Sequence, residues 1–166
     1  MIYSLLILVC SLGVGSAASA EPLQKPAGTT ILTISGKIGA TNSPGVAEFD
    51  REMLEALGMT QIQTKTPWYD GVSTFEGVPI ARLMELVQAQ GTKVTAIALN
   101  DYVTEIPMND FSEHGVILAL KREGQYLSVR NHGPLFIIYP FDSNPDLQSQ
   151  TYFGRSAWQL SRLVVK

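Results

Sequence analysis

The sequence predicts one small α+β domain, mainly β-stranded, with two or three helices. Its 166 residues are the size of a single domain of about 100–200 residues. Short apolar segments between turn residues predict about seven or eight strands. Segments with helical spacing cluster in the middle of the chain, and strands dominate its second half. This order favours an α+β fold over a parallel sheet, in which helices alternate with strands.

The first half of the domain is predicted to contain two strands and a short helix. Residues 30–34 alternate β-branched side chains, which is typical of a strand. Asp50 suits the N-cap of a short helix that ends at Gly58. Residues 60–66 are expected to be extended, because Pro67 disfavours helical backbone at the residue before it.

The clearest predicted helix covers residues 79–90. Pro79 suits a first helical turn, and Gly91 suits the left-handed position after the last turn. Four apolar residues follow the spacing i, i+3, i+4 and i+7 and predict one buried stripe. They are Ile80, Leu83, Met84 and Val87.

The second half is predicted to be a succession of strands. Glu123-Gly124 is a two-residue turn signal between two of them, which predicts a hairpin. Residues 135–139 are apolar throughout and are expected to be central. The predicted strands are residues 92–99, 102–106, 116–121, 125–129, 135–139 and 160–165.

Residues 1–20 have the features of an export signal. Ile2 to Val14 is almost wholly apolar, and Ala18-Ser19-Ala20 has the small-x-small form that precedes signal cleavage. The predicted organisation is therefore a signal peptide at 1–20, a polar linker at 21–29 and the domain at 30–166. The protein is then periplasmic and not membrane-embedded after cleavage.

Two other interpretations of this segment are weaker. A transmembrane anchor needs about 20 apolar residues to cross the bilayer, and the unbroken apolar part is shorter. A lipoprotein would use Cys10, but bulky Val9 stands before it where a small residue is expected. Because Cys10 is the only cysteine, the mature domain has no disulfide, thiolate nucleophile or cysteine-ligated metal.

Composition and missing motifs exclude several classes of function. The net charge is -3, and no basic run is longer than Lys121-Arg122, so nucleic acid is not an expected partner. The chain has no dinucleotide-binding or phosphate-binding glycine motif, no HExxH and no GxSxG. His114 and His132 are the only histidines, and two histidines without cysteine make a poor transition-metal site.

Three pairs of segments carry a family resemblance. They are Thr64–Gly71 with Phe75–Ile80, Leu99–Tyr102 with Ile106-Pro107, and Gly133–Pro140 with Ser156–Leu160. In order and spacing, they resemble the molybdopterin-binding domain of the sulfite oxidase family, over residues 31–165. The resemblance implies the sulfite oxidase-like fold.

The sequence departs from the catalytic pattern of that family. Catalytic members ligate molybdenum through a cysteine, and residues 61–66 contain none, so molybdenum is not expected. Phe136 follows Gly133-Pro134-Leu135 where the family often carries arginine. The chain more closely resembles small exported members of this fold. They bind free pterins in the periplasm and signal to a membrane-bound enzyme that makes and breaks cyclic di-GMP, and so to biofilm regulation.

This resemblance implies a tetrahydropterin-like ligand and no catalytic residue. A pterin is a flat ring with a donor edge, which calls for aromatic faces and a carboxylate or carbonyl oxygens. Trp68, Tyr69 and Tyr102 can supply the faces, and Asp101 or Asp70 the carboxylate. The remaining candidates are Asn100, Thr64 and Thr66 for orienting hydrogen bonds, and Arg130 and Arg155 for a ring oxygen, a hydroxyl or a phosphate.

Each candidate also has a purely structural interpretation. Trp68 could be a core aromatic, and Tyr69-Asp70-Gly71 a plain turn. Asn100-Asp101-Tyr102 could be a strand-to-strand turn, since Asn and Asp favour such corners. Trp158 is expected in the core rather than in a pocket.

Three functions remain open at this point. The first is a non-catalytic pterin sensor or carrier that acts through a protein partner. The second is a molybdopterin-dependent oxidoreductase that keeps its cofactor without a cysteine ligand. The third is an exported structural or adaptor module that has lost the ligand. The missing thiolate favours the first over the second.

Overall fold

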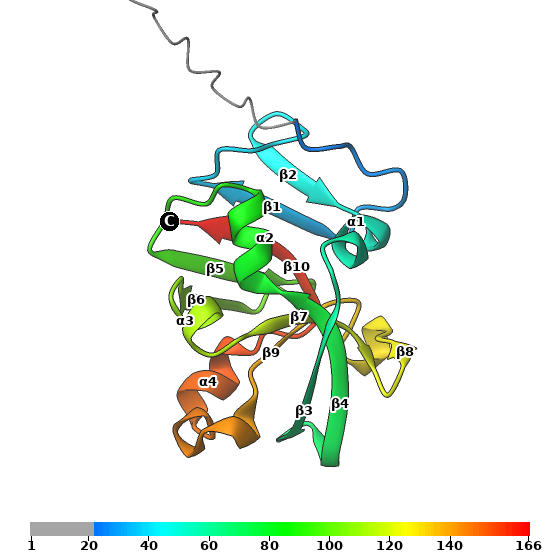
Figure 1. Ribbon diagram of the computed structural model, residues 1–166, viewed down its shortest axis with the longest axis vertical. Coiled ribbons are helices and arrows are strands. Elements are labelled where there is room, and N and C mark those ends of the chain that lie inside the picture. The colour runs from blue at the N-terminus through cyan, green and yellow to red at the C-terminus, as the bar shows by residue number, and fades with distance from the viewer. Residues whose placement is uncertain (1–21) are drawn as a thin grey trace, which may run out of the picture.

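The computed structural model describes residues 22–166, in which ten strands form two sheets flanked by four α-helices (Figure 1). The architecture is a mixed α+β domain in which strands predominate, as the sequence predicted, with more helices than the expected two or three. The predicted signal peptide lies outside the described residues. Within residues 22–166, no helix is long and apolar enough to cross a membrane.

The first sheet has the strand order β2-β1-β10-β5-β6. The central strand β10 runs parallel to β1 and antiparallel to β5. Residues 135–139, which were expected to be central, are fully buried, and their strand belongs to the second sheet. The strands are β1 (Leu32–Gly36), β2 (Val46–Phe49), β5 (Lys93–Ala98), β6 (Val103–Pro107) and β10 (Leu160–Val165).

The second sheet has the strand order β3-β4-β7-β8, and β9 also pairs with β7. The predicted hairpin is present, with Glu123 and Gly124 both at positive φ between β7 and β8. The strands are β3 (Thr60–Thr66), β4 (Tyr69–Pro79), β7 (Ile117–Arg122), β8 (Gln125–Tyr126) and β9 (Phe136–Ile138).

Short helices connect and cover the sheets. The α-helices are α1 (Arg51–Ala56), α2 (Ile80–Leu86), α3 (Asp110–Glu113) and α4 (Gln150–Arg155). Three 3-10 helices follow β8 and β9, namely η1 (Val129–Asn131), η2 (Phe141–Ser143) and η3 (Pro145–Leu147). Asp50 caps α1 as predicted, because its carboxylate accepts the Met53 N–H at 2.9 Å.

The α2 helix ends earlier than predicted. Gln88, at φ 51°, takes the left-handed position that was assigned to Gly91. The Ala89 and Gln88 N–H groups donate to the Met84 and Glu85 carbonyls, which is the bond pattern of a Schellman cap. The predicted stripe is nevertheless correct, since all four of its residues are buried.

The main core lies between α2, the inner face of the first sheet and one face of the second sheet. A smaller cluster around Phe75 and Phe136 packs elsewhere on the second sheet. Trp68 packs against both clusters. It belongs to a two-residue turn with Pro67, so the turn expected at Tyr69-Asp70-Gly71 lies two residues earlier and Tyr69 begins β4.

Candidate functional site

A cleft of about 420 Å³ lies where the β3–β4 turn, the β5–β6 turn and α4 meet. Its volume is within the range of about 300–1,000 Å³ that is typical of small-molecule sites. The lining residues are Pro67, Trp68, Asn100, Tyr102, Gln150, Phe153, Gly154, Ser156 and Trp158. Three of the predicted site residues, Trp68, Asn100 and Tyr102, therefore meet here although they are far apart in sequence.

Trp68 serves both of the roles that the sequence left open. Its ring packs edge-on against Phe136 at a centroid distance of 5.0 Å and against Phe153 at 6.2 Å. The side chain is only partly buried, and its remaining surface lines the cleft. The core contacts fix the orientation of the ring, so the face that a ligand would meet is already in place.

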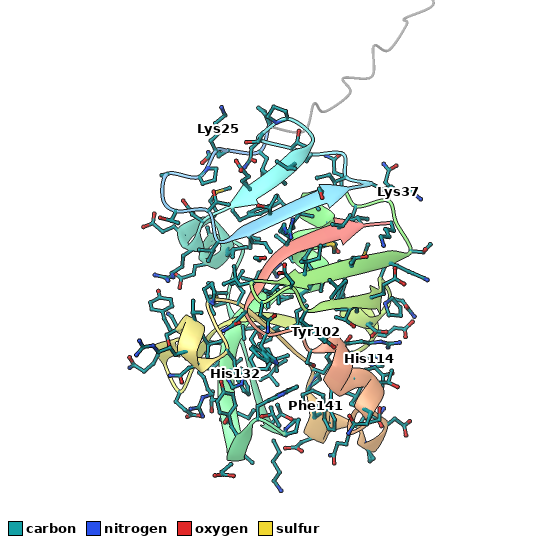
Figure 2. The ribbon with its side chains drawn as sticks, turned by 180° about the vertical axis from the view of Figure 1, so that it is seen from behind. Lys25, Lys37, Tyr102, His114, His132 and Phe141 are labelled. Atoms are coloured by element: carbon teal, nitrogen blue, oxygen red, sulfur yellow. The ribbon has the colours of Figure 1, made fainter. Side chains whose placement is uncertain are left out.

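Tyr102 spans the cleft from the β5–β6 turn to α4. Its hydroxyl donates to the Gly154 carbonyl at 2.7 Å, and its N–H donates to Asn100 Oδ1 at 3.2 Å. Tyr102 is 44% exposed (Figure 2 shows its position from behind). One wall of the cleft therefore consists of an exposed aromatic side chain held at both ends by hydrogen bonds.

Trp158 is a cleft residue that the sequence assigned to the core. It is half-buried, lines the cleft and packs edge-on against His132 at 5.1 Å. The signal that could have identified it is its place in the third family-like segment, Ser156–Leu160. One part of the Trp158 ring packs against the core, as predicted, and the other part lines the cleft.

Arg155 does not line the cleft. Its guanidinium donates to Asp110 Oδ2 at 2.8 Å, and the Tyr139 hydroxyl donates to the same oxygen at 2.7 Å. Burial and the bond to Asp110 raise the pKa of Tyr139 far above its ordinary value, so its hydroxyl remains a proton donor. Arg155 thus ties α4 to α3, behind the wall that α4 contributes to the cleft.

The two predicted threonines lie beside the cleft rather than in it. Thr64 is fully buried, and its hydroxyl accepts the Asp142 N–H at 3.0 Å and donates to the Lys65 carbonyl at 3.2 Å. Thr66 borders a smaller cavity of about 210 Å³ that shares Pro67 and Phe153 with the cleft. Its hydroxyl oxygen is buried and has no hydrogen-bond partner among residues 22–166.

Tyr69 contacts His132 behind the cleft wall. Its hydroxyl lies 2.8 Å from His132 Nδ1, and the Arg122 guanidinium lies 3.9 Å above its ring. Burial raises the pKa of Tyr69, whereas burial and the Arg122 charge lower the pKa of His132. Tyr69 and His132 therefore support Trp158, since neither of them lines the cleft.

Asp101 and Arg130 are exposed on turns next to the cleft. Asp101 has φ 63°, and its N–H donates to the Ala98 carbonyl at 3.2 Å. Arg130 lies in η1. Neither borders the cleft, and Asp70 on β4 does not border it either. Their ligand roles stay predictions.

The lining of the cleft is aromatic and uncharged. It offers indole, phenol and phenyl faces, two carboxamides and one hydroxyl, but no carboxylate, imidazole, thiolate or cation. Within residues 22–166, no group of three metal-ligating side chains occurs. This donor set suits a flat, uncharged heterocycle. It does not fit a molybdenum ion, which prefers an anionic sulfur ligand, or a phosphate group, which prefers cationic partners.

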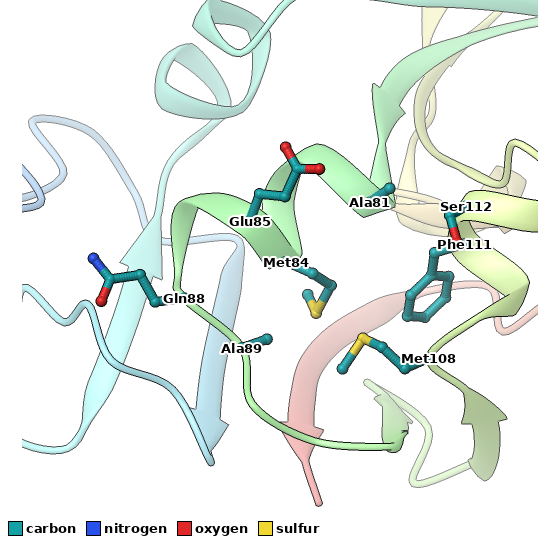
Figure 3. A pocket seen from close by; sticks show the side chains of 8 residues that line it. All are labelled: Ala81, Met84, Glu85, Gln88, Ala89, Met108, Phe111 and Ser112. Atoms are coloured by element: carbon teal, nitrogen blue, oxygen red, sulfur yellow. The ribbon is translucent and has the colours of Figure 1, made fainter.

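A second concave site has different chemistry. A groove of about 240 Å³ lies between α2 and α3 (Figure 3), where Met84, Met108 and Phe111 form an apolar floor. None of the residues predicted for the site borders this groove. Its rim carries Glu85, Gln88 and Ser112. Its volume is below the range of about 300–1,000 Å³ that is typical of small-molecule sites.

The comparison with known families agrees with the fold. The family model described as oxidoreductase molybdopterin binding domain matches residues 49–142, more than half of the chain. The chain therefore belongs to this family, and the predicted sulfite oxidase-like fold is correct. The match includes Trp68, Asn100 and Tyr102, whereas α4 and Trp158 lie beyond it. A search among curated proteins found no match to the chain.

Proposed function

We propose that this member of the molybdopterin-binding domain family is a non-catalytic pterin-binding protein. The observation that carries the proposal is an uncharged cleft whose walls present Trp68, Tyr102 and Trp158. Because the cleft has no cation for a phosphate and no anionic ligand for a metal, the proposed ligand is an unphosphorylated, tetrahydropterin-like pterin rather than the molybdenum cofactor.

The aromatic walls would supply most of the affinity. Stacking of a flat base on an aromatic side chain contributes about 1–3 kcal/mol, and a pterin ring presents a comparable face. Gln150 and Ser156 are available to orient the ring by hydrogen bonds. The acceptor for its donor edge is the side-chain oxygen of Asn100 in the β5–β6 turn, because Asn100 lines the cleft and Asp101, predicted for this contact, does not.

The proposed cellular role is that of a periplasmic sensor. The signal-like residues 1–20 support export, and the resemblance to small exported members of the fold supports a relay to a membrane-bound enzyme of cyclic di-GMP synthesis and breakdown. The alternative is a molybdopterin-dependent oxidoreductase. The two proposals differ in whether the purified protein carries molybdenum.

Calorimetric titration of the mature protein with tetrahydropterin tests the ligand. Trp68→Ala and Asn100→Ala are each expected to weaken binding about tenfold or more, since about 1.4 kcal/mol corresponds to one decade. Asp101→Asn tests whether the neighbouring carboxylate, which the sequence predicted for this contact, also contributes. Asn tolerates the left-handed backbone of position 101, so Asp101→Asn keeps the turn intact. Val72→Ser is the control, because Val72 is 57% exposed on β4 and does not border the cleft.

Each alternative gives a different result. No heat of binding at high micromolar pterin contradicts the proposal. A loss of affinity in Asp101→Asn, with wild-type affinity in Asn100→Ala, would assign the donor-edge contact to the Asp101 carboxylate instead. Metal analysis of protein produced in a host that makes the cofactor should find far less than one molybdenum per chain. Stoichiometric molybdenum would favour the oxidoreductase.

A further inference from the structure

An exposed apolar groove lies on the other side of the β5–β6 turn from the cleft. Its volume is about 350 Å³, and Leu99, Val129 and Pro134 form its apolar part. Leu99 and Val129 are 53% and 51% exposed, which is unusual for large aliphatic side chains. They belong to two different segments, the β5–β6 turn and η1, so the apolar surface is assembled by the fold.

The register of the first sheet extends this surface beyond the groove. Arg162 borders the groove, and it is the cross-strand partner of Ile97, which in turn is the partner of Val103 on β6. Cross-strand partners point to the same face of a sheet. In Figure 2 this back face lies toward the viewer, and no helix of residues 22–166 covers it. Ile97 and Val103 therefore add apolar surface to the face that carries Arg162, and Val103, on the edge strand, is 55% exposed.

Two cations accompany the groove. Arg162 borders it, and Arg130 directly follows Val129 in η1. Both are exposed, and neither has a salt-bridge partner among residues 22–166. The whole chain carries a net charge of -3, so these unpaired cations beside apolar surface are a local feature.

The groove is joined to the back of the cleft through Gln159. The Gln159 carbonyl accepts the Leu99 N–H at 2.8 Å, and its side-chain amide donates to the Val129 carbonyl at 2.7 Å. Gln159 directly follows Trp158, which lines the cleft. One residue thus holds together both apolar segments of the groove, next to a wall of the candidate ligand site.

We propose that this groove is the docking site for a segment of a partner protein that carries apolar side chains flanked by Asp or Glu. An aliphatic or aromatic side chain of the partner would fill the space between Leu99 and Val129, and its carboxylates would pair with Arg130 and Arg162. A second copy of this chain is the weaker occupant, because a two-fold contact through the groove would bring like arginines together. The docking proposal does not depend on the identity of the pterin.

Selection from a random peptide library displayed on phage tests the chemistry of the partner. The mature protein is the target, with counter-selection against the double variant Leu99→Ser/Arg162→Glu. The enriched peptides are expected to combine Leu, Ile or Phe with Asp and Glu. A synthetic peptide of the enriched sequence is then titrated against the wild type, Arg162→Glu and Leu99→Ser.

Each single variant is expected to weaken peptide binding at least tenfold. Lys37→Glu is the matched charge reversal, because Lys37 follows the opposite end of β1, and it should bind the peptide as the wild type does. Pterin affinity measured in parallel should be unchanged in all variants, which separates this surface from the cleft.

Several results would overturn the proposal. The selection could enrich basic peptides, or no peptide at all. Alternatively, Arg162→Glu could bind the selected peptide as tightly as the wild type does, or Lys37→Glu could weaken peptide binding as much as Arg162→Glu does. Sedimentation that finds a dimer broken by Leu99→Ser would assign the groove to a second copy. Binding to vesicles containing phosphatidylglycerol that is lost in Arg162→Glu, without any peptide selected, would assign it to a membrane surface.

Discussion

His132 is the side chain on which the aromatic residues behind the cleft converge. Its ring stacks on Phe136 at 5.6 Å and meets Trp158 edge-on at 5.1 Å, while Nδ1 lies 2.8 Å from the Tyr69 hydroxyl. Burial and the nearby Arg122 charge lower its pKa below the ordinary value of 6.5. The folded protein therefore favours the neutral imidazole.

Stability is predicted to fall in mild acid because of His132. The unfolded chain takes up the proton near pH 6.5, whereas the folded protein does so only at lower pH. Between these values the unfolded state binds more protons, so the free energy of unfolding decreases as the pH falls below 6.5. Urea unfolding from about pH 8 to about pH 5 measures this dependence.

Two variants separate His132 from other titrating groups. His132→Asn, which tolerates the left-handed backbone at φ 64°, should flatten the dependence, and His114→Gln should keep it. The Met53 and Gly28 N–H groups lower the pKa of Asp50, so its contribution to the free energy of unfolding is lost only below pH 3.8. An equally steep decline in His132→Asn would show that another group is responsible.

At the scale of elements, α4 depends on its contacts with the rest of the fold. A helix of six residues is not stable alone, because nucleation is costly relative to the few bonds gained. The Arg155–Asp110 ion pair, with the Tyr139 hydroxyl on the same oxygen, attaches its last turn to α3 and β9. Since Phe153 and Gly154 line the cleft, this attachment also determines the shape of the candidate site.

Asp110→Asn is predicted to lower both stability and pterin affinity. Removing one partner of a buried ion pair costs about 3–5 kcal/mol, and partial exposure of Arg155 reduces the expected loss to about 2 kcal/mol. Urea unfolding and pterin titration measure the two effects. Glu105→Gln is the control, because Glu105 is exposed and its ion pairs with Lys93 and Lys166 are on the surface, so this variant should change the free energy of unfolding little. If Asp110→Asn is destabilised but binds the pterin with unchanged affinity, the attachment of α4 does not determine the shape of the site.

At the scale of the whole molecule, the candidate site lies at the junction between two sheets. Trp68 comes from the second sheet, Asn100 and Tyr102 from the first, and α4 closes the space between them. Trp68 also packs against both apolar clusters. The position of the cleft is therefore a property of how the two sheets pack, and no single element contains it.

Export is the prediction that concerns the chain as a whole. The native protein is expected to begin at Glu21 or within a residue or two of it, because Ala18-Ser19-Ala20 precedes that position. Intact-mass measurement of protein from the producing cell decides the point. A mass that includes Met1 to Ala20, or one with a lipid on Cys10, contradicts the periplasmic assignment.

Local sequence signals were sufficient for much of the secondary structure. Short strand-like runs located β5, β6 and β10, Pro67 supported the extended segment that is β3, and Asp50 located the start of α1. The long strand β4 was missed, because Gly71, Gly77 and Pro79 resemble breaks in a strand. The α4 helix was missed because its six residues have neither a strong apolar period nor a side-chain cap.

The composition of the candidate site was only partly predictable. The sequence by itself determined that residues 22–166 offer no thiolate, and it identified Trp68, Asn100 and Tyr102 through the family resemblance. Only the tertiary structure decided which neighbours join them. Trp68 lies in the β3–β4 turn and borders the cleft, whereas Tyr69 begins β4 and lies behind it. In the β5–β6 turn, Asp101 has left-handed backbone at φ 63°, and Asn100 and Tyr102 border the cleft while Asp101 does not. Trp158 joins them because the packing of the two sheets brings the start of β10 to the same place.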